Sequence, residues 1–365
     1  MAMPHTKVTD DFCGCAYTAK VKKFTKMMSE YGYDITLYAP EGSDCSNSAL
    51  VEVLSDQERL EIFGVDDPSL LPSWPSEEQF ALFNHRVIDA LRENVSGRDI
   101  VLLTAGYSHK PIADALPNML FCEPGVGYEG VFTDRCAFES YAWMHYVYGK
   151  NGIADGRWFD CVIPNYFDTS QFSVGSGTGG YLLYLGRLIH RKGVETAALI
   201  AQESGMPLVV AGAGKMDLPG DVEFVGPVGV EERNKLMGDA LALLAPTYYI
   251  EPFGGVAVEA MLAGTPVITT DWGAFSETVI DGVTGYRFRS LQQGVDAVWN
   301  SSFLERSIVS SITSERFSLE SVAPQFDKWF HHLGTLWDNG WYQRLENLNV
   351  GTKRGNSIST QLLSH

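Results

Sequence analysis

Two glutamates, Glu251 and Glu259, stand eight positions apart and flank a Pro-Phe-Gly-Gly turn in the segment EPFGGVAVE. The turn leads into a short apolar stretch that ends at Gly264, with Pro266 soon after, and this pattern predicts a short helix. A helix N-terminus presents backbone N–H groups without partners and attracts an anion such as phosphate. Two carboxylates beside a phosphate suit a ligand that also carries hydroxyls, and a sugar nucleotide has hydroxyls at both ends of its diphosphate.

A basic loop, GRLIHRKG, follows a predicted strand and precedes a predicted helix. It contains Arg187 and Lys192. A bidentate guanidinium and a point-charge ammonium are a suitable pair for clamping a diphosphate, and they would neutralise the charge that grows on a leaving group. Alone, two such cations are most simply surface residues. Together with the EPFGGVAVE segment they predict phosphate binding.

The two glutamates suit different parts of such a ligand. Glu259 lies about one turn, or roughly 6 Å, into the predicted helix, which suits a carboxylate that accepts hydrogen bonds from ribose hydroxyls. Glu251 precedes the helix and is suited to the sugar. The simpler alternatives are a helix-dipole partner for Glu251 and a solvated helix face for Glu259, although apolar residues crowd around Glu259.

Two further loops follow predicted strands in the same half of the chain. Gly212 stands in a Gly-Ala-Gly sequence, which is a weak signal because it can serve only to allow a tight turn. Gly226 and Val228 follow the next strand, at a rim where a nucleotide base would contact backbone groups. We expect these three positions to contribute to donor binding.

The second half of the chain alternates strands and helices regularly. We expect strands at 181–185, 208–211, 223–225, 242–245 and 267–270. Helices are expected at 194–204, 231–239 and 255–263. Strands separated by helices of this length predict a parallel sheet with right-handed crossovers.

The first half is less regular. We expect strands at 34–39, 99–105, 120–122 and 161–163, a loop at 123–128, and helices at 17–29, 79–92 and 131–148. Only Met1–Met3 precede the Pro4-His5 pair, so the first strand is predicted to be very short or absent.

A Gly/Ser/Thr-rich stretch near 173–180 predicts the domain boundary. The predicted class is α/β, with two Rossmann-like domains that face each other across a cleft at the carboxyl ends of their strands. We expect an N-terminal domain, a C-terminal domain, a helix that returns to the N-terminal domain, and a polar tail, at 1–172, 173–318, 319–345 and 346–365.

Composition places limits on location and partners. No apolar run approaches the ~18–20 residues that span a membrane, and the start lacks a signal-peptide pattern. Six scattered cysteines form no zinc-type spacing, so free thiols in the cytoplasm are expected. A net charge of −18 opposes general adhesion to nucleic acid or membranes. Four lysines between Lys20 and Lys26 keep an anionic acceptor open.

Five segments in order, VIPNYFD, LGRLIHRKG, LVVAGAG, VEFVGPV and EPFGGVAVEAMLAGTPVITTDWGAFSETVIDGVTGY, resemble retaining glycosyltransferases of family 4, the glycosyl transferases group 1 with the GT-B fold. They extend over nearly all of residues 160–290. The start of the chain, with Pro4-His5-Thr6 and Cys15–Thr18, also resembles some family members.

The resemblance implies a nucleotide-diphospho-sugar donor, such as a UDP or GDP sugar, bound by the C-terminal domain, and an acceptor bound by the N-terminal domain. It also implies no metal or other cofactor. It implies retention by front-face displacement, in which the leaving phosphate helps to deprotonate the acceptor. The backbone at Phe253, Gly254 and Gly255 would cradle phosphate and sugar. Gly14, in the Cys-Gly-Cys loop, would approach the donor phosphate or the acceptor.

The same resemblance assigns catalytic roles. Arg187 and Lys192 would bind the diphosphate, Glu251 the donor sugar and Glu259 the ribose. A histidine of the first domain often assists in this family. The candidates are His109 and His145, of which His109 is better placed, although a packing role is at least as compatible with its sequence context.

Other functions stay open from the sequence. A GT-B epimerase-like enzyme and a non-catalytic nucleotide-sugar-binding protein are the alternatives, whereas a phosphorylase would need a pyridoxal phosphate lysine and a longer chain. The acceptor can be a glycan, a protein, a lipid-linked anchor or modified DNA. A homo-oligomer is also left open.

Overall fold

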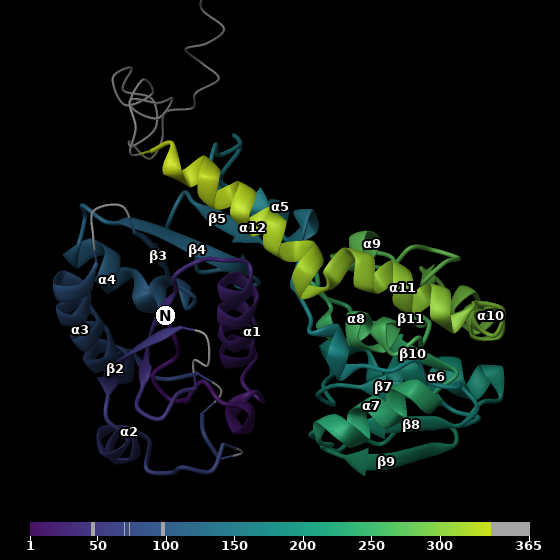
Figure 1. The fold of residues 1–365 in the computed structure, drawn as a ribbon. Coiled ribbons are helices and arrows are strands. Elements are labelled where there is room, and N and C mark those ends of the chain that lie inside the picture. Colours follow the sequence, from purple (N-terminus) through teal and green to yellow (C-terminus); the bar gives the residue numbers. More distant parts are fainter. Residues whose placement is uncertain (45–47, 69, 73, 96–98, 337–365) are drawn as a thin grey trace, which may run out of the picture. The chain divides into compact units, whose positions relative to one another are not determined.

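The computed structural model describes residues 1–44, 48–68, 70–72, 74–95 and 99–336. The chain divides into two compact units (Figure 1). The second unit comprises Glu139–Tyr146 and Pro164–Val322, and the first comprises Met1–Phe138, Val147–Ile163 and the described residues from Ala323 onward. The division between Ile163 and Pro164 lies nine residues before the predicted boundary at 172/173, and Glu139–Tyr146 also belongs to the second unit. Residues 337–345 of the predicted C-terminal helix, the predicted tail 346–365 and Cys45 lie outside the described residues.

The second unit is built on a six-stranded parallel sheet in the order β12-β11-β10-β7-β8-β9. Counted from the first strand of the unit, this is the 3-2-1-4-5-6 order of a Rossmann sheet, which reverses between β7 and β10. The strands are β7 (Leu182–Leu185), β8 (Leu208–Ala211), β9 (Val222–Gly226), β10 (Ala242–Ala245), β11 (Val267–Thr270) and β12 (Gly285–Phe288).

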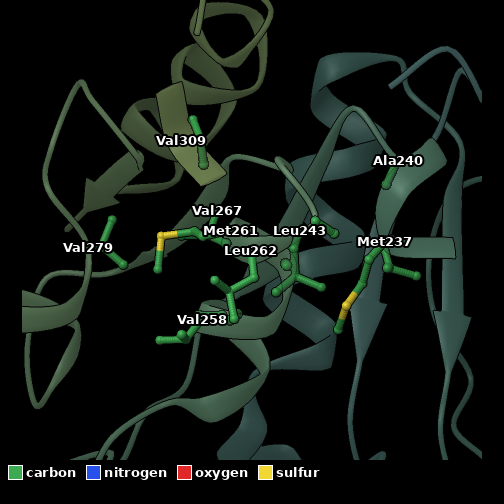
Figure 2. Packing of buried hydrophobic residues seen from close by; sticks show 14 of the residues in the cluster. Met237, Ala240, Leu243, Val258, Met261, Leu262, Val267, Val279 and Val309 are labelled. Carbon is green, nitrogen blue, oxygen red and sulfur yellow. The ribbon is translucent and has the colours of Figure 1, made fainter. Parts of the chain in front are cut away.

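Alternate residues of these strands are buried on opposite faces, because side chains along a strand point alternately to its two sides. Leu183 and Leu243 join one apolar cluster and Leu182 and Leu244 the other. Figure 2 shows the first cluster, in which Met261 and Val309 pack with sheet residues. The helices of this unit are η3 (Thr169–Gln171), η4 (His190–Lys192), α6 (Val194–Ser204), α7 (Val230–Asp239), α8 (Gly255–Leu262), α9 (Phe275–Thr278), α10 (Leu291–Ser301) and α11 (Arg306–Phe317).

The first unit contains two parallel sheets that the N-terminal residues link. The strands are β1 (Thr36–Pro40) with β2 (Ala49–Leu54), and β3 (Ile100–Leu102), β4 (Leu120–Val126), β5 (Cys136–Phe138) and β6 (Cys161–Val162) in that order. No strand is assigned to Met1–Met3. The Met1 amino group nevertheless donates to Leu102 O at 3.0 Å, and Ala2 N donates to Tyr38 O at 3.0 Å. The segment thus lies between β1 and β3, where a Rossmann sheet has its first strand.

The helices of the first unit include two that the sequence did not indicate, α2 (Asp56–Phe63) and α4 (Lys110–Ala115). The others are η1 (Asp10–Phe12), α1 (Ala16–Glu30), α3 (Glu77–Asn94) and η2 (Gly106–His109), while α5 (Tyr141–Lys150) and α12 (Leu319–Gly334) each have residues in both units.

Two local predictions in this unit are wrong. The predicted loop at 123–128 is strand up to Val126, and the predicted helix at 131–148 is correct only from Tyr141 onward, because Cys136–Phe138 forms strand β5. Every residue of β4 is buried, including Pro124 and Gly125, whose types usually interrupt strands. In a fully buried strand the apolar pattern does not alternate, so the sequence carries no period-2 signal.

Two buried carboxyl groups fix β5. The Glu123 carboxylate accepts from Phe132 N at 3.0 Å and Thr133 N at 2.8 Å. Asp160 accepts from Cys136 N and from the Tyr148 hydroxyl, both at 2.8 Å. Burial raises the pKa of Asp160 to about 6 and raises that of Glu123 above its ordinary value. Their hydrogen bonds offset part of the cost of burying these groups.

The last helix, α12, packs its aromatic face against the first unit from Ala323 onward. Phe326 meets Phe24 edge to face at 5.1 Å, and the Trp329 indole N–H donates to Phe159 O at 2.8 Å. The Tyr33 hydroxyl donates to Asp327 at 2.7 Å. These contacts tie residues distant in sequence into one unit.

A single arginine joins four segments of the second unit. Arg306, at the start of α11, donates to Gly175 O at 2.8 Å, Gly238 O at 2.9 Å and Ala240 O at 3.1 Å. It also donates to the Thr265 hydroxyl. Burial lowers the pKa of this guanidinium. The side chain therefore holds the segment around Gly175, which leads into β7, against the end of α7.

Replacing Arg306 by methionine should therefore destabilise the protein strongly. The substitution leaves three backbone carbonyls without this donor, and we expect the free energy of unfolding to fall by about 3 kcal/mol or more. Urea unfolding checks this. Arg289→Met is the matched control, because Arg289 is exposed and pairs with Asp271 at the surface, so its loss should cost less than about 1 kcal/mol. Equal losses would contradict the role given to Arg306.

Candidate functional site

The residues of the second unit that could take part in a reaction lie at the carboxyl ends of β7 and β10. These strands pair in parallel, with Leu182 opposite Ala242 and Leu183 opposite Leu243. They are the two strands between which the strand order of the sheet reverses. In open α/β sheets, ligands bind beyond the carboxyl ends at such a reversal. The loop after β7 carries the predicted cations, and the loop after β10 carries the EPFGG segment.

The two loops contact each other directly. Tyr248 N donates to Arg191 O at 3.0 Å. Gly193 has φ +75°, and a Cβ there would lie 1.9 Å from Pro246 O. Only glycine permits this approach at that backbone conformation. The contact brings Lys192 and Glu251 together across 59 residues of sequence.

Glu251 is the centre of the site. Its carboxylate is largely buried, and Oε2 accepts from Lys192 Nζ at 3.0 Å and from the Tyr249 hydroxyl at 2.5 Å. Its backbone oxygen accepts from Ala274 N at 3.0 Å. The pair of donors on one oxygen holds the carboxylate in one orientation.

The ring of Tyr249 lies beneath two cations. The Arg191 guanidinium is 4.4 Å from the ring centroid and Lys192 Nζ is 4.9 Å from it. Burial, and then the neighbouring Glu251 carboxylate, raise the pKa of the Tyr249 hydroxyl well above its ordinary value. The hydroxyl therefore keeps its proton and acts as a donor to Glu251.

Helix α8 begins at Gly255, as the sequence predicts, and its N-cap residue, Gly254, has no side chain that could cap the N-terminus. Gly254 adopts the left-handed conformation at the cap. Phe253 anchors the turn in the core, with its ring stacked at 6.2 Å from Phe167, and Pro252 O accepts from the Ser140 hydroxyl at 2.7 Å. The backbone N–H groups of the first turn are thereby fixed in place.

Glu259 follows one turn into α8, where its side chain is 19% exposed. Its Oε2 lies 3.5 Å from Arg233 Nη1, on α7. Arg233 is a neighbour that the sequence did not indicate, because nothing in the local pattern of α7 shows which face meets α8. The same holds for Tyr249, whose position beside EPFGG was visible but whose contacts arise only from the packing of two distant loops.

The remaining predicted donor-side residues lie at the same edge of the sheet. The Arg187 side chain is exposed, and its backbone oxygen accepts from the Tyr184 hydroxyl at 3.0 Å. Gly212 has φ +148°, and a Cβ there would lie 1.9 Å from Gly186 O. Gly212 N donates to Gly226 O at 2.8 Å, and Val228 follows half-buried. Gly212 thus has a structural reason to be glycine, and the roles of these residues in donor binding stay predictions.

Two predicted residues, His109 and Gly14, belong to the first unit. His109 is fully buried, with its ring 5.6 Å from Phe80 and 6.1 Å from Phe83, and neither ring nitrogen has a hydrogen-bond partner in the described part of the chain. Burial lowers its pKa to about 3, so the ring is neutral. This placement favours packing over proton transfer. Gly14 is exposed, and an added Cβ there would meet nothing within 4 Å.

Within residues 1–336, apart from the short gaps, no helix has the length and apolarity needed to cross a bilayer. No group of three or more His, Cys, Asp or Glu side chains in the same described ranges is arranged to hold a metal ion. The expectation that no metal is needed is a separate matter and stays a prediction.

Solved structures establish the fold class. The glycosyltransferase AviGT4, involved in avilamycin A biosynthesis, matches with a TM-score of 0.64 at 21% identity, over 87% of this chain and 90% of that one. An Anabaena protein, Alr3699/HepE, solved in complex with UDP-glucose, matches with a TM-score of 0.60 at 16% identity, over 85% and 94%. The prediction of an α/β GT-B fold with two Rossmann-like units is confirmed.

Sequence comparison shows which family part of the second unit resembles. Residues 167–293 match the family described as glycosyl transferases group 1. The predicted family is thus confirmed. Glycogen synthase of Mycobacterium tuberculosis is 38% identical over 152 residues, which are 37% of this chain and 34% of that protein. The chain spans less than half the length of the first curated relatives that it matches.

The two glycines at the start of α8 should respond differently to alanine. A Cβ on Gly254, where φ is +81°, would lie 2.4 Å from a Phe275 ring carbon, whereas one on Gly255 would meet only Phe167, at 3.8 Å. Gly254→Ala should lower the free energy of unfolding by about 2–4 kcal/mol through backbone strain and overlap. Gly255→Ala should leave it unchanged or slightly raised. Urea unfolding of both variants checks this, and similar losses would contradict the described turn.

Proposed function

We propose that this protein is a glycosyltransferase that binds a nucleotide-diphospho-sugar beyond the ends of β7 and β10 and moves the sugar to an acceptor hydroxyl. One observation carries the proposal. An acid, a cation and an uncapped helix N-terminus, contributed by Glu251, Lys192 and α8, meet at the strand-order reversal of a Rossmann sheet. The family of residues 167–293 supports the same activity.

Each group has a distinct part in the proposed binding mode. The diphosphate lies at the N-terminus of α8, where backbone N–H groups and the helix dipole favour an anion. Arg187 and Lys192 bind its oxygens, and their charge stabilises the diphosphate as it leaves. Glu251 accepts hydrogen bonds from the donor sugar. Glu259 accepts them from the ribose, at the side of the diphosphate nearer the base.

The proposed reaction proceeds with retention and without a metal ion. The bond from the anomeric carbon to the phosphate oxygen breaks while the acceptor oxygen bonds to the same face of that carbon. The acceptor proton passes to an oxygen of the leaving phosphate. The positive charge that the leaving group requires comes from Arg187, Lys192 and the helix N-terminus. No second carboxylate of glycosidase type is needed.

For the donor, the proposal extends to the nucleotide base. We infer a UDP or GDP sugar, and the UDP-glucose complex of a protein with the same fold favours UDP. Neither a guanidinium nor an ammonium that binds phosphate distinguishes one base from another. The acceptor contributes a hydroxyl group to the reaction.

A thermal-shift screen with UDP, GDP, ADP and dTDP sugars tests donor binding, because a ligand that binds only the folded state raises the unfolding midpoint. We expect one nucleotide to raise it. Lys192→Ala should then increase Kd for that nucleoside diphosphate about tenfold or more. Lys235→Ala is the matched control, since Lys235 is exposed on α7 and pairs with Asp239, and it should leave Kd unchanged.

The catalytic part of the proposal is tested at Glu251. Glu251→Gln keeps the size of the side chain but removes its charge, and we expect transfer or donor hydrolysis, followed as released nucleoside diphosphate, to fall by at least about a hundredfold. Turnover at the wild-type rate in this variant would reject the proposed transferase site.

A further inference from the structure

Two groups in the proposed site compete for one cation. In the structure the Lys192 ammonium pairs with the Glu251 carboxylate at 3.0 Å. In the proposed function, on which this inference rests, the same ammonium binds the donor diphosphate. A diphosphate carries more negative charge than a carboxylate and draws the ammonium toward itself. Glu251 is only 9% exposed, and a buried carboxylate that loses its cation without another partner costs several kcal/mol.

The Tyr249 hydroxyl is the donor that remains on Glu251. It lies 2.5 Å from the same oxygen, Oε2, that Lys192 contacts. A neutral phenol has no net charge for the diphosphate to attract, so it keeps its partner when the ammonium turns away. The raised pKa of the hydroxyl is consistent with this donor role.

The ring of Tyr249 interacts with the neighbouring cations, independently of its hydroxyl. Arg191 and Lys192 both lie over its face, at 4.4 and 4.9 Å from the centroid. Cations are attracted to the face of an aromatic ring, more strongly where water is excluded. The ring thus orients the basic loop, while the hydroxyl orients the carboxylate.

We propose that Tyr249 is a positioning residue of the transfer reaction. Its hydroxyl holds Glu251 toward the donor sugar when Lys192 moves to the diphosphate. Its ring holds Lys192 within reach of both the Glu251 carboxylate and the diphosphate. Two parts of one side chain therefore affect two different kinetic quantities. The hydroxyl affects the rate of transfer, and the ring affects affinity for the diphosphate.

Two variants separate these effects, and both are measured with the full chain. Tyr249→Phe removes the hydroxyl and keeps the ring. We expect kcat to fall about tenfold, the size of one hydrogen bond to a charged group, while Kd for UDP, or the diphosphate found in the screen, stays within about twofold of the wild-type value. Tyr249→Leu removes the ring as well, and we expect Kd to rise about fivefold in addition to the fall in kcat.

The separation of kcat from Kd is a readout that a purely structural residue would not give, because a general loss of folding would impair both quantities. Tyr248→Phe is the control, because the Tyr248 hydroxyl contacts Thr196 Oγ1 at 2.6 Å at the surface, and it should match the wild type in kcat and Kd.

The outcomes are distinguishable. If the wild type turns over and Tyr249→Phe has the same kcat as Tyr248→Phe, the positioning role is rejected while the transferase function stands. If Tyr249→Phe instead loses diphosphate affinity and keeps kcat, the assignment of the hydroxyl to Glu251 is rejected. A wild-type protein that neither binds a nucleoside diphosphate nor turns over any donor rejects the proposed function, and this inference with it.

Discussion

The close contact between two loops, one after β7 and one after β10, is the constraint on which the candidate site depends. It exists because β7 and β10 are neighbours in the sheet although two other strands lie between them in sequence. Glycine at position 193 lets the backbones touch. Only then do Lys192 and Glu251 meet, at 3.0 Å. A side chain at Gly193 would push apart the cation and the carboxylate that the proposed chemistry needs together.

Each of the two acids in the site has a cation beside it before any ligand is bound. Glu251 has Lys192 as its cation, and Glu259 has Arg233 within 3.5 Å. Both carboxylates are mostly buried, and such groups are costly to leave unpaired. A diphosphate that takes over a cation must therefore be accompanied by new partners for the acid. Sugar and ribose hydroxyls supply such partners in the proposed complex, and this makes binding of the whole sugar nucleotide favourable over binding of a bare anion.

How well the sequence predicted the structure differs between the two units, for physical reasons. In the second unit, strands at 208–211, 242–245 and 267–270 and the helix at 194–204 are observed with the predicted bounds, because short apolar runs between polar turns leave little ambiguity. In the first unit, β4 and β5 are buried throughout and β4 contains Pro124 and Gly125, so their pattern resembled a loop or a helix.

Similarly, EPFGG and the basic loop were visible in sequence, whereas Tyr249 and Arg233 act through contacts between distant segments. The family resemblance also made His109 a candidate to assist the reaction, although its ring is packed between phenylalanines.

Amide hydrogen exchange with and without saturating UDP, or the nucleoside diphosphate that binds best, tests the central claim most directly. The claim is that the strand-order reversal of the second unit holds the donor diphosphate. The account predicts slower exchange in the loop at 186–193 and at the first turn of α8, with β4 of the first unit unchanged. Binding that leaves both of those segments unprotected, or protects only the loops of the first unit, would contradict it.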